Sequence, residues 1–333
     1  MTIITEQHNA AAGNSPIKNP ATEAGMHVED TTDAFDPTLV LHGLFPLSRL
    51  IRFVRERCPP GHVDEAEQLQ RWRDARAVAL ELAASEAGYA DAIDVQALPD
   101  DLQALGAAAL RQPSMHRITS LVPRAWRMVE VDRMVVFQDS LNLRHLATLR
   151  EFFPAAPSAR EVMALAAGQG VGAHPPVRYS QADGDYAFAS ASNDLRFLDV
   201  AVLDPSAITS YEPFGAASHA IVIYLGFSDN VISATRFGDR IILTNGSHRA
   251  HLLRSLGIRH IPCLVTDASD NDISDILLPA AIKQEREFYL RAARPPLFKD
   301  YSDARLTQVV PVVRKNYVLR AKLDLKRTTV PAA

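Results

Sequence analysis

Hydrophobic positions recur at helical spacing through the first third of the chain. Leu47, Leu50 and Val54 share one face of a predicted helix, and arginines occupy the other face. The clearest helical pattern covers residues 63–88, and a further helix is expected over 100–111. Residues 37–115 are therefore predicted to be a helical region. The apolar face expected for the helix at 63–88 consists of Ala77, Leu80, Leu82 and Ala83. Residues 1–36 lack an apolar period and are predicted to be a flexible tail.

The middle and the end of the chain mix helical and strand-like patterns. A first strand is expected within 117–138, and helices are expected over 141–153 and 159–168. Ser158 followed by Glu161 is a capping-box pattern at the start of the second helix. Further expected elements are strands at 196–203 and 220–226, a helix at 273–293, and a terminal strand or hairpin at 309–325. Together these elements predict an α+β protein.

The most informative pattern, at residues 239–265, indicates strand, turn, helix, turn and strand in succession. An apolar run at 241–243 suits a buried strand, and Asn245-Gly246 is a turn signal because glycine permits positive φ. Ser247 stands where a helix N-cap is expected. Gly257 ends the helix, and the next strand begins near Ile261.

This turn has the properties of an anion site. A glycine turn that opens a helix leaves backbone N–H groups unpaired, and the helix dipole adds partial positive charge at the same place. His248 and Arg249 lie in the first turn of this helix. Basic residues are unfavourable there, beside the positive end of the dipole, and a bound anion would offset that cost. A guanidinium at position 249 could grip phosphate oxygens in a bidentate way. The alternative is that Asn245-Gly246-Ser247 only caps a helix, with His248 and Arg249 facing solvent.

Gly246-Ser247-His248-Arg249, followed by Gly257 and Ile261-Pro262, resembles the phosphate motif of the ParB/sulfiredoxin superfamily. The resemblance implies a mixed α/β domain over 116–270. It also implies that the loop Asn245–Arg249 holds the phosphates of ATP or CTP, with Mg²⁺. In sulfiredoxins a catalytic cysteine follows the motif glycine. Ser247 stands there in this chain, so repair of sulfinic acid is not expected.

A second segment, 129–138, resembles the first strand box of the same superfamily, although an ordinary edge strand fits it equally well. About 100 residues separate this segment from the motif strand, so the domain is expected to contain an insertion. Glu130 would be the acid beside the first strand, and His248 the second catalytic residue. Residues 271–333 give a C-terminal helix and a basic strand region in place of the helix-turn-helix of partition proteins. The closer analogues are the small-molecule kinases of the superfamily.

Histidines near the motif offer a metal-binding alternative. His248 and His251 have an i, i+3 spacing that could bind a transition metal, and His219 could join them. Neither a His-Glu-x-x-His motif nor a two-histidine, one-carboxylate spacing occurs locally. A role for His248 as a hydrogen-bond donor to phosphate fits the motif better than chelation does.

Bulk composition narrows the function classes. The net charge of −4 argues against a dedicated DNA-binding protein, and the chain contains no run of apolar residues long enough for a membrane helix. The first residues lack the pattern of a secretory signal, and two cysteines do not make a disulfide framework, so a cytoplasmic location is expected. A homodimer is compatible with the sequence.

Three hypotheses about function remain. The first is a nucleotide-dependent enzyme acting on a small-molecule substrate, with ATP-dependent phosphoryl transfer as the expected reaction. The second is a metal-dependent tailoring enzyme that uses the same loop for an amino-acid-like or carboxylate substrate. The third is a non-catalytic, nucleotide-responsive regulatory or DNA-binding protein, against which the acidic balance of the chain counts.

Overall fold

The computed structural model describes residues 34–112, 115, 123–169, 174–182, 184–208, 215–227, 230–268 and 278–330. These residues form two compact units. The larger unit takes its residues from the ranges Ala34–Gly172 and Asp229–Val313, and the smaller unit takes its residues from Ala173–Ser228 and the segment after Val313. The units do not follow the expected boundaries near 115 and 270, because the helices before residue 115 pack into the same core as the strands that follow.

Two sheets organise the larger unit. The five-stranded sheet has the order β10-β9-β11-β3-β2, in which only the pair β11 and β9 is parallel. Its strands are β2 (Val95–Ala97), β3 (Arg124–Glu130), β9 (Ser233–Phe237), β10 (Arg240–Asn245) and β11 (His260–Ala268). The second sheet has the antiparallel order β12-β1-β4 and consists of β1 (Phe35–Leu41), β4 (Ser140–Asn142) and β12 (Thr307–Val313).

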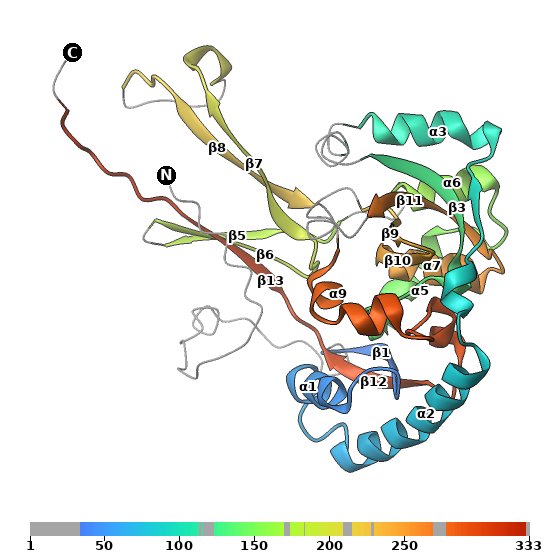
Figure 1. Cartoon of the computed structure of the whole chain (residues 1–333). Coiled ribbons are helices and arrows are strands. Elements are labelled where there is room, and N and C mark those ends of the chain that lie inside the picture. Colours follow the sequence, from blue (N-terminus) through green and yellow to red (C-terminus); the bar gives the residue numbers. More distant parts are fainter. Residues whose placement is uncertain are drawn as a thin grey trace. The chain divides into compact units, whose positions relative to one another are not determined.

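Helices cover these sheets (Figure 1). The α-helices are α1 (Leu47–Arg57), α2 (Glu65–Ser85), α3 (Asp100–Leu110), α5 (Leu143–Phe152), α6 (Ala159–Ala166), α7 (Ser247–Ser255) and α9 (Ala280–Gln284). Shorter segments are η3 (Tyr89–Ala92), η4 (Val131–Arg133), the π-helical η6 (Glu287–Arg291) and η7 (Phe298–Ser302). In the described part of the chain, no helix is long and apolar enough to cross a membrane.

The described part of the smaller unit is built from strands and one short 3₁₀ turn. Its three-stranded antiparallel sheet has the order β13-β6-β5, and a separate two-stranded antiparallel sheet pairs β7 with β8. The elements are β5 (Arg178–Ala182), β6 (Asp185–Ser190), β7 (Leu195–Leu203), η5 (Pro205–Ala207), β8 (Ala220–Phe227) and β13 (Tyr317–Lys322).

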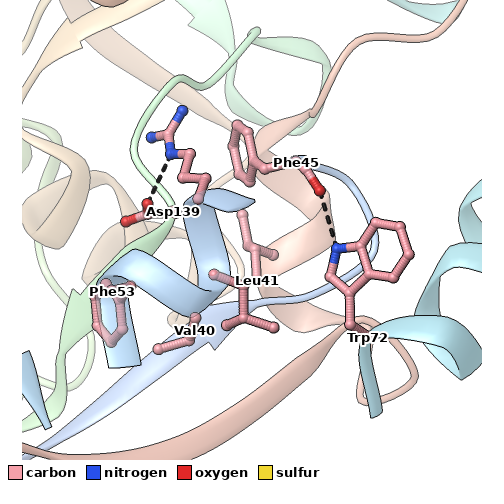
Figure 2. Close-up of a pocket in the computed structure, with 8 residues that line it drawn as sticks. Val40, Leu41, Phe45, Phe53, Trp72 and Asp139 are labelled. Carbon is pink, nitrogen blue, oxygen red and sulfur yellow. Dashed lines mark hydrogen bonds and ion pairs between the residues drawn. The ribbon is translucent and has the colours of Figure 1, made fainter. Parts of the chain in front are cut away.

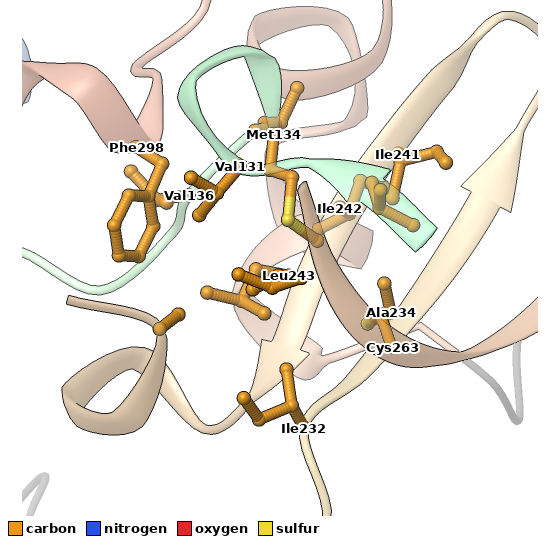
Figure 3. Close-up of a cluster of buried hydrophobic side chains, with 14 of the residues drawn as sticks. Val131, Met134, Val136, Ile232, Ala234, Ile241, Ile242, Leu243, Cys263 and Phe298 are labelled. Carbon is orange, nitrogen blue, oxygen red and sulfur yellow. The ribbon is translucent and has the colours of Figure 1, made fainter. Parts of the chain in front are cut away.

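In the core of the larger unit, buried side chains of β9, β10 and β11 lie together with Val131, Met134 and Phe298 (Figure 3). Ile241, Ile242 and Leu243 of β10 are buried, as their apolar run predicted, and Leu252 and Leu253 of α7 are buried with them. Because β10 is packed in the core, the residues after Leu243 have a fixed position at the end of the sheet. The buried leucines of α7 fix the position of that helix in the same way. This arrangement positions the loop before α7.

The expected α+β class is confirmed, since the protein mixes helices with mainly antiparallel sheets. Most of the expected helices and strands are present. The capping box is also present, because the Ser158 hydroxyl accepts from the Glu161 N–H and the Glu161 carboxylate accepts from the Ser158 N–H.

Several expectations were wrong. The range 37–115 contains β1 and β2 as well as helices, and on α2 the side chains that are buried are Gln68, Ala75 and Ala79, whereas Leu80 is exposed. Of the two alternatives for the alternating segment 309–325, strands are present and a hairpin is not, because β12 pairs with β1 and β13 pairs with β6. In the helix expected over 273–293, residues 273–277 lie outside the described residues, and the rest is broken after Gln284. Residues 1–33 of the expected tail also lie outside the described residues.

Candidate functional site

The loop between β10 and α7 is a tight turn held by side-chain hydrogen bonds. Gly246 has a φ of 89° and is the N-cap of α7, so the expectation that Ser247 is the N-cap is wrong by one residue. The side-chain oxygen of Asn245 accepts from the Gly246 N–H at 2.9 Å, and its amide donates to the side-chain oxygen of Asn230 at 2.9 Å. Asn245 is exposed, whereas Ser247 is buried as the first helical residue.

A side chain at position 246 would not fit. A Cβ there would lie 2.9 Å from Ile232 Cγ1, closer than real Cβ atoms approach other atoms, and 3.0 Å from Ile232 Cα, tighter than most Cβ contacts. The same Cβ would lie 3.2 Å from an Nη atom of Arg249. Glycine is therefore required by the left-handed φ and also by the close approach of two neighbouring segments.

Arg249 lies beneath this turn and not on its surface. The residue is 3 % exposed, and its guanidinium donates to the carbonyl oxygen of Leu165 at 3.2 Å. It also donates to the carbonyl oxygen of Asn230 and, at 2.6 Å, to the Asn230 side chain. The expected bidentate grip of Arg249 on a phosphate does not fit this geometry. Its donors instead hold the end of α6 and the segment at Asn230 against the loop.

His248 joins α7 to the start of α5. Its Nε2 accepts from the backbone N–H of Asn142 at 2.9 Å, so the ring proton lies on Nδ1. Burial, followed by the charges of His145, His251 and Arg249, lowers the pKa of His248 from 6.5 to about 3. The imidazole is therefore neutral at physiological pH. With Nε2 engaged and Nδ1 protonated, His248 is built to donate a hydrogen bond and not to accept a proton.

The first turns of two helices thus meet at one place. Asn142 is the N-cap of α5, its side chain accepts from the His145 N–H at 3.0 Å, and the ring of His145 meets the ring of His248 edge-on at 4.9 Å. Burial and the charge of Arg249 lower the pKa of His145 as well. Since both helices begin here, the positive ends of their dipoles converge. His145 and Asn245 are exposed, so this junction reaches the surface.

A carboxylate and a guanidinium border the same junction. Asp36 of β1 accepts from the Asn142 side-chain amide at 2.8 Å and pairs with Arg144 Nε at 2.8 Å. Arg144 lies in the first turn of α5, where its positive charge opposes the helix dipole. Asp36, Asn142, Arg144 and His145 therefore belong to the candidate site, although sequence reasoning missed all four.

Glu130 lies away from this junction. It is opposite His260 in the pairing of β3 with β11, and it forms an ion pair with Arg133 at 3.2 Å. The neighbouring Asp132 pairs with Arg254 in the last turn of α7. Glu130 thus belongs to the C-terminal end of α7, about 13 Å along the helix from the loop. The structure does not bring Glu130 and His248 together as a catalytic pair.

The histidines proposed as metal ligands come from both units of the chain. His219 lies in the smaller unit and His251 in the larger unit. His251 faces Phe298 and Tyr301, with ring centroids 6.4 Å from each, and its Nδ1 is buried. Among the residues that the structure describes, no three histidine, cysteine, aspartate or glutamate side chains are close enough to hold a metal ion.

A separate small cavity of about 10 Å³ lies between α1, α2 and β1 (Figure 2). Its walls are mostly apolar, and its polar side chains already bind one another or the backbone. Arg49 donates to Asp139 at 2.8 Å and to the carbonyl of Phe137 at 2.6 Å, and Trp72 donates to the carbonyl of Phe45 at 3.0 Å. The pocket is smaller than typical ligand sites. It offers no polar group to orient a ligand, and the helix junction remains the candidate site.

Comparison with known proteins gives no further guidance. No protein family, no curated protein and no solved structure matches this chain.

Proposed function

We propose that this protein is a nucleotide-dependent enzyme that transfers a phosphoryl group from ATP to a small molecule. The phosphates would lie at the junction of the first turns of α5 and α7. The observation that carries this proposal is the hydrogen bond from the Asn142 N–H to His248, which ties the two helix starts together. Converging helix N-termini favour an anion by their dipoles and by their free N–H groups.

The donors at the junction suit a phosphate chain. In the described part of the chain, the backbone N–H groups of Ser247 and His248 have no hydrogen-bond partner, as expected for the first turn of a helix. The Nδ1–H of His248 adds a neutral donor beside them. Arg249 supplies positive charge from below, since its charge also contributes to the lowered pKa values of His248 and His145. In this proposal Arg249 holds the loop in place, and its positive charge attracts the phosphates without touching them.

Asp36 is the residue that would help to hold Mg²⁺. A magnesium ion bound to nucleotide phosphates needs only one or two protein carboxylates, because phosphate oxygens and water complete its shell. Asp36 is tied to the N-cap of α5 by its hydrogen bond with Asn142. The ion would neutralise charge on the phosphates. No general base is assigned, because Glu130 lies at the other end of α7 and His248 holds its proton on Nδ1.

These residues would position the phosphates and stabilise the negative charge of the transition state. These two effects supply most of the catalysis in phosphoryl transfer. The fixed turn at Gly246 would orient the phosphates, and the two helix starts would stabilise the charge that develops on the transferred group. The resemblance of Gly246-Ser247-His248-Arg249 to the ParB/sulfiredoxin phosphate motif supports a nucleotide as the ligand. It also favours membership of that superfamily, which stays a proposal.

The donor set also favours one second candidate, an enzyme that binds a carboxylate substrate at the same junction. Backbone N–H groups and a neutral imidazole serve a carboxylate as well as they serve a phosphate. Such a ligand would need neither Mg²⁺ nor the nucleotide base. The two candidates therefore differ in which ligands stabilise the folded protein.

A thermal unfolding panel with the full chain tests the proposal. ATP, CTP, GTP and ADP would each be added with and without Mg²⁺, beside acetate, succinate and glutamate as carboxylate probes. Stabilisation by nucleoside triphosphates that increases with Mg²⁺ is expected, because a ligand that binds only the folded state raises Tm. A rise in Tm with the carboxylates alone would contradict phosphoryl transfer and support the carboxylate-binding enzyme. An unchanged Tm with every ligand would contradict both candidates.

A further inference from the structure

The two-stranded sheet of the smaller unit has one unusual edge. β8 reads Ala-Ile-Val-Ile-Tyr-Leu-Gly-Phe, eight residues without a charge or a proline. Among the described residues it pairs only with β7, so the N–H and C=O groups along its other edge have no strand beside them. Natural proteins rarely leave a long, uncharged, β-branched edge strand open, because it readily pairs with another chain.

The opposite edge of the same sheet has the protection that β8 lacks. β7 carries a bulge at Leu198, where the register shifts between Phe197 and Asp199. Arg196 and Asp199 add charges to β7, and Arg196 pairs with Asp194 at the start of the strand. Bulges and charged side chains are common means of blocking edge pairing. The contrast indicates that β7 is an outer edge and that β8 is an edge meant to be paired.

The sheet is also too small and too apolar to be complete. Val202 of β7 and Ile221 of β8 lie opposite each other and are 66 % and 46 % exposed, and Tyr224 is 45 % exposed. Two strands alone are marginally stable in water, whereas three or more strands with an apolar face are stable. Additional strands at the β8 edge would complete the sheet.

We propose that β8 pairs with β8 of a second copy of this chain, giving a continuous four-stranded antiparallel sheet in the order β7-β8-β8-β7. An antiparallel strand pairs with its own copy about a two-fold axis, which is the usual symmetry of dimers. A charged strand would set like charges against each other in such a pair, but β8 has none to oppose. This charge pattern makes a second copy the best occupant. The proposal is independent of the proposed function.

The test uses charge at the middle of β8. In a two-fold antiparallel pair the central residues of each strand lie near their own copies, so Tyr224→Lys and Tyr224→Glu each set like charges close together. The mass of the full-length protein in solution would be measured over a wide range of concentration for the wild type, for each variant and for their mixture. Val202→Lys is the matched control, because Val202 is also exposed but lies on β7.

The expected wild-type mass is twice the chain mass of 36.5 kDa. Each Tyr224 variant is expected to be a monomer, their mixture a heterodimer, and Val202→Lys a dimer. A monomeric wild type would overturn the proposal, and so would dimers that persist in both Tyr224 variants. If a Tyr224 variant shows no cooperative thermal unfolding, Ile223→Lys and Ile223→Glu, also at the middle of β8, take the place of the pair. Recovery of a dimer only on mixing excludes simple misfolding.

Discussion

The backbone N–H of Asn142 donates a 2.9 Å hydrogen bond to Nε2 of His248, and this contact joins the first turns of α5 and α7 across 106 residues of sequence. It fixes the tautomer of the imidazole, which burial keeps neutral, and it brings two helix dipoles to one point. The candidate anion site is therefore a property of two helices together. Neither helix start alone has this set of donors.

Arg249 is expected to be a structural residue of the site. Arg249→Ala removes the donors to Leu165 and Asn230 and leaves buried carbonyl oxygens unpaired, so the free energy of unfolding should fall by about 3 kcal/mol. Urea unfolding measures this loss. Arg160→Ala, at an exposed position on α6, is the control and should change the free energy by less than about 0.5 kcal/mol. Equal stability of the two variants would show that Arg249 does not hold the loop.

Gly246 and Gly238 form a matched pair of left-handed glycines. Gly238 has a φ of 58° and open space around the position that a Cβ would take, whereas a Cβ at Gly246 would meet Ile232 at 2.9 Å. Gly238→Ala should destabilise the fold by about 1 kcal/mol from backbone strain alone. Gly246→Ala adds a steric conflict and should destabilise it by about 3 kcal/mol in chemical denaturation. Equal losses would mean that the loop relaxes around the added methyl group.

His248 should make stability depend on pH. Because its pKa is lowered from 6.5 to about 3, the unfolded chain binds a proton between these values and the folded protein does not. Its contribution is fully present above pH 6.5 and is lost as the pH falls, by up to about 1.4 kcal/mol per unit.

His248→Gln keeps an acceptor for the Asn142 N–H but removes the titration, so its free energy of unfolding should fall less steeply between about pH 7 and pH 5. His42, whose pKa is also lowered, to about 4, is present in both proteins and its effect cancels in the comparison. Parallel stability curves for the wild type and His248→Gln would show that His248 is not neutral in the folded protein.

Local signals in the sequence predicted local structure well. The Ser158–Glu161 capping box, the apolar run of β10 and the Asn245-Gly246 turn each depend on residues close together in sequence, and each is present. The N-cap was placed one residue late because serine is a common capping residue. Gly246, with its positive φ, begins the helix instead, and Ser247 packs inside.

Long-range pairing could not be predicted from these signals. β1 contains Pro37, and proline disfavours a central strand because it has no N–H to donate. In the structure Pro37 lies opposite Pro311 of β12, and β4 does not extend as far as Pro37 on the other side of β1. Pro37 therefore needs no hydrogen bond to a second strand. The partnership of His248 with Asn142 depends on β1 and β4 aligning α5 with α7. The sequence predicts Arg249 at the surface because its residue type suits phosphate binding. In the structure Arg249 is buried together with Ala250 and Leu253 of α7.

The most direct test of the anion site is the dissociation constant for ATP with Mg²⁺, measured by titration calorimetry on the wild type and on Asn245→Asp. The carboxylate keeps an acceptor for the Gly246 N–H, suits a helix N-terminus and gives up only the exposed hydrogen bond to Asn230, so the fold should be retained, but its charge opposes a phosphate. We predict binding weakened about tenfold or more, with Gln181→Glu, an added charge on exposed β5, unchanged. Equal affinity of the wild type and Asn245→Asp would contradict the account.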